Sequence, residues 1–398
     1  MAFGHGEVGD VLPMEPGLRV SAQAALRAVD SPGTLPSARM DGVLIRGDAG
    51  PDPVGLRLEH ATVAAAWRIN PQWGVHAAAG AHDQDPAHVE AAWIQWRRDG
   101  EAGQAWLLTA GRQRMSLGPV LGDEGHIGPY GLVPLAQRAA FDHALADDGM
   151  QFGWRAPTGA ADLALDLGIW RGQRFPGAEH GGSRSPGISL HAGASWQAWS
   201  ADVAWLRVQP KARGASTSPA AGHSHGSPVC DPLFTEVACF GGRAQVMGGS
   251  LRWTGAESAS RLPLNLTMGG WRRHERGVLE SGNGQADYRG LTAGSWFDAD
   301  WLWHARWSLG WRHERLSVRH RLNGSGAGLL AQESRLQHAG PWRRDTLQLT
   351  WQARAWARLS LAGGEETATG QRTRFTVLRL VLGGDWNGLP GTLGKDGA

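Results

Sequence analysis

The sequence has almost no lysine, no long apolar run and only two cysteines. No segment approaches the ~18 consecutive apolar residues that a membrane-spanning helix requires, which excludes a helical membrane protein. The formal net charge of +2 gives no reason to expect nucleic acid as a partner. Lysine is limited to Lys211 and Lys395 among 39 basic residues, a bias that high genomic GC content would also produce.

Recognisable enzyme motifs are lacking as well. No Gly-x-Ser-x-Gly elbow, His-Glu-x-x-His pair or phosphate-cradling glycine loop occurs in the structural context that such motifs need. The sequence therefore predicts a protein that is not an enzyme.

Tryptophan and glycine are abundant, with 21 and 58 residues, and tryptophan alternates with polar residues. In the segment Trp301–Arg312, one face at period two carries four tryptophans, and the other carries His304, Arg306 and Arg312. Such a strand suits a barrel with lipid outside and water inside. It equally suits a soluble antiparallel sheet with one dry face.

Units of about ten alternating residues, each followed by a break, recur along the whole chain. We interpret each unit as a strand. The sixteen expected strands are 18–29, 55–69, 72–81, 88–98, 105–114, 149–156, 161–171, 187–196, 200–208, 243–254, 262–273, 286–296, 301–315, 346–355, 357–362 and 373–382.

The breaks between these units alternate between short and long. The short ones are 70–71, 99–104, 157–160, 197–199, 255–261, 297–300 and 356. The long ones are 30–54, 82–87, 115–148, 172–186, 209–242, 274–285, 316–345 and 363–372. Alternation of this kind is typical of outer-membrane barrels, with short periplasmic turns and long external loops, whereas soluble sandwiches and propellers have no reason to show it.

The predicted fold is therefore all-β: a single transmembrane antiparallel β-barrel of about 16 strands in the bacterial outer membrane. The barrel covers residues 1–386, and a glycine-rich tail follows at 387–398. Fourteen or eighteen strands remain open, because 316–345 is long enough to contain a hairpin. A barrel of this size encloses an aqueous channel.

Several short motifs accompany this layout. Gly111-Arg112 followed by Gly118-Pro119 would end a strand and open the longest loop, and after Arg138 and Phe141 the segment 148–151 would begin the next strand. The closing strands at 347–351, 358–363 and 375–382 complete the pattern. With these features the chain resembles Gram-negative outer-membrane porins, and in particular the superfamily that contains phosphate-selective porins.

The chain departs from that superfamily in two ways. Phosphate-selective members line their path with lysines, but no expected strand here contains one, so no phosphate-binding residue is carried over. Barrels of this type usually end on an aromatic residue, whereas here Trp386 is the last aromatic and the tail follows it.

The resemblance implies that residues 115–148 fold into the barrel as a constriction loop. The pore-constriction residues expected on it are Asp123, Glu124, His126, Arg138, Asp142 and His143. The lumen-wall residues expected opposite are His304, Arg306, Arg312, Arg354 and Arg379, with Arg68 and Arg155. An acidic loop facing a basic wall would create a field across the pore. Alternatively, these charges only solvate a wet lumen and pair with one another.

The external loop 209–242 contains histidines and both cysteines. Cys230 and Cys239 are predicted to form a disulfide in an oxidising compartment. His223 and His225 could hold a divalent metal, although a tight site needs three or four ligands, and they are otherwise ordinary polar loop residues. No other cofactor is predicted.

The function predicted from the sequence is an outer-membrane porin for passive diffusion of small hydrophilic solutes or ions. One alternative is a barrel plugged by its own loops that binds metal ions or a partner at its histidine-rich rim. Another is a soluble all-β protein. The partners expected for the porin are outer-membrane lipid, lipopolysaccharide, its solutes and two further copies in a homotrimer.

Overall fold

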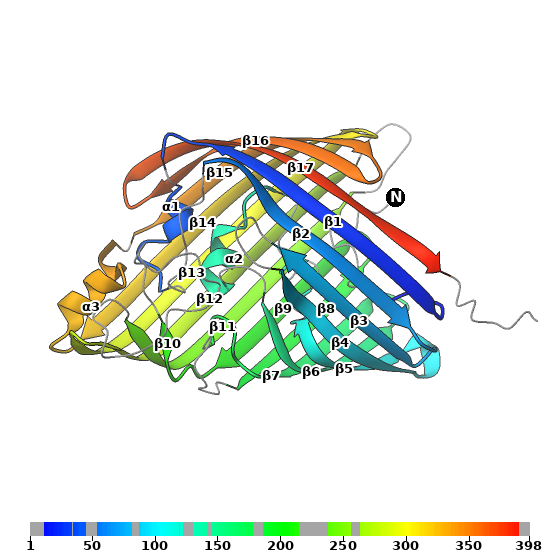
Figure 1. Cartoon of the computed structure of the whole chain (residues 1–398), viewed down its shortest axis with the longest axis horizontal. Helices are drawn as coiled ribbons and strands as arrows, with labels where there is room; N and C mark the ends of the chain where they lie inside the picture. Colours follow the sequence, from blue (N-terminus) through cyan, green and yellow to red (C-terminus); the bar gives the residue numbers. More distant parts are fainter. Residues whose placement is uncertain are drawn as a thin grey trace, which may run out of the picture.

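The chain forms a closed barrel of antiparallel strands (Figure 1). The computed structural model describes residues 12–33, 35–44, 54–81, 87–118, 120–121, 130–141, 145–177, 186–214, 238–255, 263–338 and 340–389. Within these residues, sixteen long strands follow one another around the wall. The barrel closes because β1 (Gly17–Asp30) pairs with β2 (Gly55–Arg68) on one side and with β17 (Gln371–Leu389) on the other. The predicted fold class is confirmed.

The other strands run in chain order, each antiparallel to the next. They are β3 (Trp73–Ala81), β4 (His88–Asp99), β5 (Ala105–Arg114), β6 (Ala146–Pro157), β7 (Asp162–Trp170), β8 (Gly187–Trp196), β9 (Trp199–Val208), β11 (Cys239–Thr254), β12 (Leu264–Ser281), β13 (Gly284–His304), β14 (Trp307–Asn323), β15 (Trp342–Arg354) and β16 (Ala357–Ala368). The two-residue β10 (Arg213–Gly214) pairs with the start of β11.

Short helices lie in the connections between strands. They are α1 (Pro36–Arg39), α2 (Leu135–Phe141) and α3 (Ala327–Glu333), with 3₁₀ turns at Glu101–Gly103 and Leu336–His338. Figure 1 shows α2 within the barrel and α3 at one end of it. None of the helices in the described part of the chain has the length and apolar character needed to cross a membrane.

The two faces of the wall differ in chemistry. Outward residues such as Val63 and Leu347 are more than half exposed, whereas inward Asp166 and Arg312 are buried. Because side chains alternate between faces, the period-two pattern places apolar groups outside and polar groups inside. Most of the exposed tryptophans lie beside the short turns. They are Trp67, Trp73, Trp106, Trp196, Trp199, Trp301, Trp303, Trp351 and Trp356.

The segment Trp301–Arg312 is a hairpin, so its prediction as one strand is wrong. β13 ends at His304, and β14 begins at Trp307 after a two-residue turn. The outward alternation continues through the turn because the pairing shifts by one residue between Leu302 and His304, so that Trp301 pairs with Leu309. Without the shift, the residues of β14 would exchange faces and Trp307 and Trp311 would point into the lumen. With the shift, the tryptophans of both strands lie outside. The expected break at 297–300 lies inside β13.

Two of the expected long loops are two-residue turns, at 282–283 and 369–370. β12 continues to Ser281 and β16 to Ala368, well past the ends predicted for them. On these extensions most outward side chains are polar, as at Arg276 and Glu365, so the apolar alternation that identified the strands stops before the strands do.

The outer face gives a first prediction. Replacing outward Leu347 of β15 by arginine should lower the free energy of unfolding by about 2–4 kcal/mol, because it places a charge in the apolar band. The measurement is guanidinium unfolding of the protein folded into vesicles. The matched control is Thr350→Arg on the lumen side of the same strand, which should cost much less. Equal costs at both positions would contradict this assignment of faces.

Candidate pore constriction

α2 lies against the inner wall formed by β12, β13 and β14. The ring of Phe141 meets Trp271 edge-on at a centroid distance of 4.7 Å, and Trp271 Nε1 donates a hydrogen bond to Gln137 Oε1 at 2.5 Å. Trp271 and Trp296 face inward and are buried in the same apolar cluster as Ala136 and Ala140. Inward tryptophans would be misplaced beside water, so α2 gives them an apolar partner.

The segment before α2 is attached to the wall through its backbone. Four consecutive carbonyl oxygens, those of residues 130–133, each accept a hydrogen bond from a different wall arginine. The pairs are Arg379 with Tyr130 (3.4 Å), Arg27 with Gly131 (3.1 Å), Arg312 with Leu132 (3.4 Å) and Arg344 with Val133. We call the four arginines, Arg27, Arg312, Arg344 and Arg379, the arginine clamp. They come from β17, β1, β14 and β15, which are four of the five successive strands from β14 round to β1.

Three of the clamp arginines are also paired with wall carboxylates. Arg312 donates two hydrogen bonds to Asp298 (2.7 and 2.8 Å), and Arg379 donates two to Glu59 (2.6 and 3.2 Å). Their charges are therefore balanced within the wall. Removing one partner of such a buried pair costs about 3–5 kcal/mol, because it leaves the other charge uncompensated.

Arg344 sits at the centre of the most connected of these groups. It donates to both oxygens of Glu314 (2.7 and 3.0 Å) and to Glu366 (3.4 Å), and the three residues lie directly opposite one another on β14, β15 and β16. Glu314 also accepts the backbone N–H of Leu135 at 2.6 Å, at the first residue of α2. One carboxylate therefore links the wall arginine to the helix.

Tyr130 adds a side-chain contact to the clamp. The guanidinium carbon of Arg312 lies 4.1 Å from the centre of its ring, and its hydroxyl donates to Asp300 at 3.2 Å. Burial, followed by the charges of Asp300 and Asp298, raises the pKa of Tyr130 well above its ordinary value. The hydroxyl therefore stays protonated and able to donate.

The beginning of the loop is held separately on the opposite side. Ser116 Oγ donates to Asp166 at 2.9 Å, and His191 lies between Asp166 (2.9 Å) and Asp202 (3.0 Å). Gly118 has φ +83°, and a Cβ at this position would lie 2.2 Å from the carboxylate of Asp202. Glycine is needed here both for the backbone conformation and for the close approach. The loop is thus attached to the wall at both of its ends.

The expected constriction residues divide into two groups. Arg138 lies on α2 and is half-buried. The other five lie outside the described residues and stay predictions. They are Asp123, Glu124, His126, Asp142 and His143.

The expected wall residues also divide. Arg312 and Arg379 face the lumen and reach the loop, as members of the arginine clamp. His304, Arg306 and Arg354 lie instead at the short-turn end of the barrel, in or beside two-residue turns, and are exposed. The hairpin at 301–315 places His304 and Arg306 there, and Arg354 is the last residue of β15.

The external loop predictions rest largely on residues that the structure does not describe. Cys239 begins β11 and is buried, but Cys230, His223 and His225 lie outside the described residues. The disulfide and the metal site therefore stay predictions. Among the residues that are described, no cluster of three or more histidine, cysteine or acidic side chains could hold a metal ion.

The partners of the clamp arginines were missed in the sequence. Asp298 and Glu314 have the inward parity of Arg312, so alternation places all three in the lumen. Arg344 was assigned to the expected loop 316–345, and its role becomes visible only once β15 is extended to Trp342.

Comparison with known proteins finds the fold but no family. No protein-family model and no curated protein matches the chain. The trimer form of OmpT of Vibrio cholerae is 10% identical, with a TM-score of 0.55, and the match covers 93% of this chain and 100% of that one. OmpF of Salmonella typhi, in complex with daunomycin, is 10% identical, with a TM-score of 0.54, covering 94% and 99%. The outer-membrane channel DcaP of Acinetobacter baumannii is 8% identical, with a TM-score of 0.54, covering 95% and 100%.

At these identities the likeness establishes the fold, which is that of porin-like outer-membrane barrels. These matches do not test the resemblance to phosphate-selective porins, which stays a prediction.

The clamp gives a second prediction. Glu314→Ala should destabilise the protein by about 3–5 kcal/mol and speed amide exchange at residues 130–141 at least about tenfold, because Arg344 loses the carboxylate that accepts two of its hydrogen bonds and the Leu135 N–H loses its acceptor. Hydrogen-exchange mass spectrometry measures the second effect. Asp345→Ala is the control, since it removes an outward carboxylate from the residue next to Arg344. Unchanged exchange in Glu314→Ala would show that the loop is held by other contacts.

Proposed function

We propose that the protein is a porin of the bacterial outer membrane, through which small hydrophilic solutes or ions diffuse passively. The observation that carries this proposal is the arginine clamp. A barrel with an apolar exterior and a polar interior holds one internal segment rigidly against one side of its lumen. Such an arrangement narrows a channel to a defined cross-section. One of the structures that share the fold supports it: DcaP of Acinetobacter baumannii is described as an outer membrane channel.

The passage we propose runs along the wall opposite the clamp. Residues 130–133 and α2 occupy the side formed by β12 to β17 and β1. On β4 and β6, inward Gln95, Gln151 and Arg155 are only half-buried. Amide and guanidinium groups there can replace part of a solute's hydration shell without binding it tightly, which is the condition for passage.

The clamp arginines are not the selectivity groups in this proposal. Arg312 and Arg379 have their charges matched by Asp298 and Glu59, so the field that they add to the lumen is small. Arg155 is matched by Asp166 in the same way, so the sign of ion preference then depends on the remaining charges of the loop. A homotrimer is consistent with the trimer form of the Vibrio cholerae OmpT that shares the fold.

The third prediction concerns conduction. Purified protein in a planar bilayer should give steady current steps, and Gln95→Trp should lower the single-channel conductance by about half or more, because it fills the proposed passage. Ile94→Trp, on the outward face of the same strand, should conduct like the natural protein. A reversal potential under a salt gradient gives the preferred ion sign.

The possible results separate two claims. Stable insertion without current would overturn the porin proposal and favour a barrel plugged by its loops. Current that is unaffected by Gln95→Trp would keep the porin but place its passage elsewhere.

A further inference from the structure

A row of four arginines crosses the outer face of the barrel. Arg243 of β11 lies directly opposite Arg276 of β12, which lies opposite Arg289 of β13, which lies opposite Arg321 of β14. All four are exposed, and they alternate with inward neighbours such as Glu275 that are buried. We call these four residues the outer arginine row.

This row lacks counter-charges from the protein. None of the four arginines forms an ion pair with any carboxylate in the described part of the chain. The outward carboxylates on the same strands, Glu280 and Asp287, lie nearer the hairpin tip. Like charges directly opposite one another destabilise a sheet, so four in succession require compensation from outside.

Other outward arginines nearby differ in this respect. Arg343 donates to Asp345 at 2.8 Å, and Arg372 and Arg374 both lie against Glu365. The wall therefore supplies partners to outward arginines elsewhere on the same sheet. Four exposed arginines in register on one surface, without an ion-paired carboxylate among the described residues, make the outer arginine row a candidate binding site for an anion.

The height of the row on the barrel points to the kind of anion. Arg289 lies twelve residues along β13 from Trp301, which belongs to the exposed tryptophans at the short-turn end. With a strand tilt of ~40° this corresponds to about 30 Å along the barrel axis, slightly more than the roughly 25 Å of the apolar band. The row therefore lies at the level of lipid headgroups on the long-loop side.

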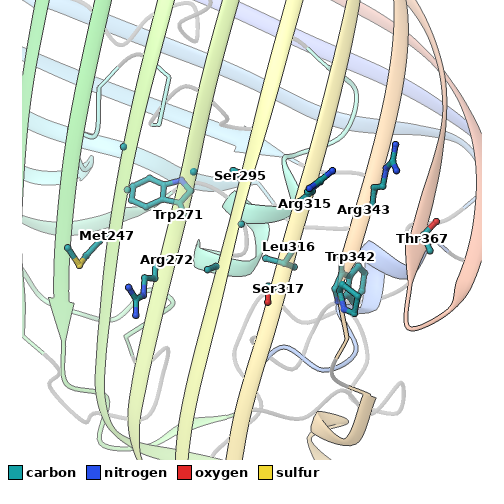
Figure 2. A pocket seen from close by; sticks show the side chains of 16 residues that line it. Met247, Trp271, Arg272, Ser295, Arg315, Leu316, Ser317, Trp342, Arg343 and Thr367 are labelled. Carbon is teal, nitrogen blue, oxygen red and sulfur yellow. The ribbon is translucent and has the colours of Figure 1, made fainter.

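A groove lies directly below the row, toward the middle of the apolar band. It has a volume of about 980 Å³ and crosses β11 to β16 (Figure 2). Its outward floor is made of small residues, among them Gly270, Ala293 and Ser317. Arg272, Arg315 and Arg343 also line it, as Figure 2 shows. On β12, Arg272 in the groove is four residues from Arg276 in the row, and both side chains lie on the same face of the strand.

We propose that the outer arginine row and this groove bind one phosphorylated lipid of the surrounding outer leaflet. The guanidinium groups of Arg276 and Arg289 hold its phosphates through charge-assisted hydrogen bonds, and its acyl part lies over the small residues of the groove. The inference rests on the proposed function, because it requires the barrel to lie in an outer membrane.

A second copy of the chain fits this surface less well. A protein partner would have to present an acidic patch to four arginines. The exposed outward carboxylates in the described residues are scattered, and Asp148, Asp345 and Glu365 are already paired with arginines. Charge complementarity therefore favours the lipid over another protomer.

The test uses the double variant Arg276→Ala/Arg289→Ala and native mass spectrometry of the full chain in neutral detergent. The probe is diphosphoryl lipid A, compared with its dephosphorylated form and with phosphatidylethanolamine. Natural protein should retain diphosphoryl lipid A preferentially, and the double variant should bind it at least about tenfold more weakly. Inorganic phosphate at millimolar concentration should not displace it, since phosphate alone lacks the acyl contacts.

The matched control is Arg372→Ala/Arg374→Ala, which removes two outward arginines that already have a carboxylate partner. It should change lipid affinity less than about twofold. Without lipid, the row variant should melt no lower than the natural protein, because repulsion between arginines has been relieved.

Three results would overturn the inference: equal binding of the phosphorylated and dephosphorylated lipids, equal loss in the two double variants, or loss of the oligomer instead of the lipid. Conductance of the same variants separates this inference from the porin proposal. If the row variant conducts normally and still binds the lipid, only the lipid-site inference is overturned. If the natural protein carries no current, the porin proposal is overturned.

Discussion

The requirement that backbone groups inside a barrel find partners explains the arginine clamp. Residues 130–133 are neither helix nor strand, so their carbonyls depend on donors from the wall. A guanidinium group can hold a carboxylate with two N–H groups and still donate a third to a carbonyl, which is how Arg312 serves both Asp298 and Leu132. Lysine lacks this fork. The internal segment, the position of α2 and the proposed narrowing all depend on these few side chains.

Periodicity predicted the membrane part of the fold well. The strands at 105–114 and 187–196 agree with β5 and β8 at both ends, and in β8 the outward residues are apolar throughout. The failures have particular causes. The irregular pairing near Leu302 hid the turn between β13 and β14, since it preserved the outward parity. Beyond the apolar band, outward residues such as Arg276 removed the signal although hydrogen bonding continued to Ser281.

The site was harder to predict than the strands. Parity alone placed Arg312 and Arg379 in the lumen, but their partners come from elsewhere: Asp298 lies 14 residues from Arg312, and Glu59 lies 320 residues from Arg379. The path of residues 130–133 has no period from which it could be deduced. Which carbonyl meets which arginine follows from how the closed barrel brings β1 beside β17, and only the assembled structure contains that information.

The same residue type performs opposite tasks on the two faces of the wall. Arg343 and Arg344 are adjacent in the chain, yet Arg344 holds Glu314 and the loop inside, whereas Arg343 lines the groove outside. A slip of one residue in β15 would bring Arg343 into the lumen and turn Arg344 outward, separating it from Glu314 and Glu366. Each displaced charge would cost several kcal/mol. The ion pairs of the interior and the exposed residues of the exterior therefore specify the same register, because only one alignment satisfies both faces.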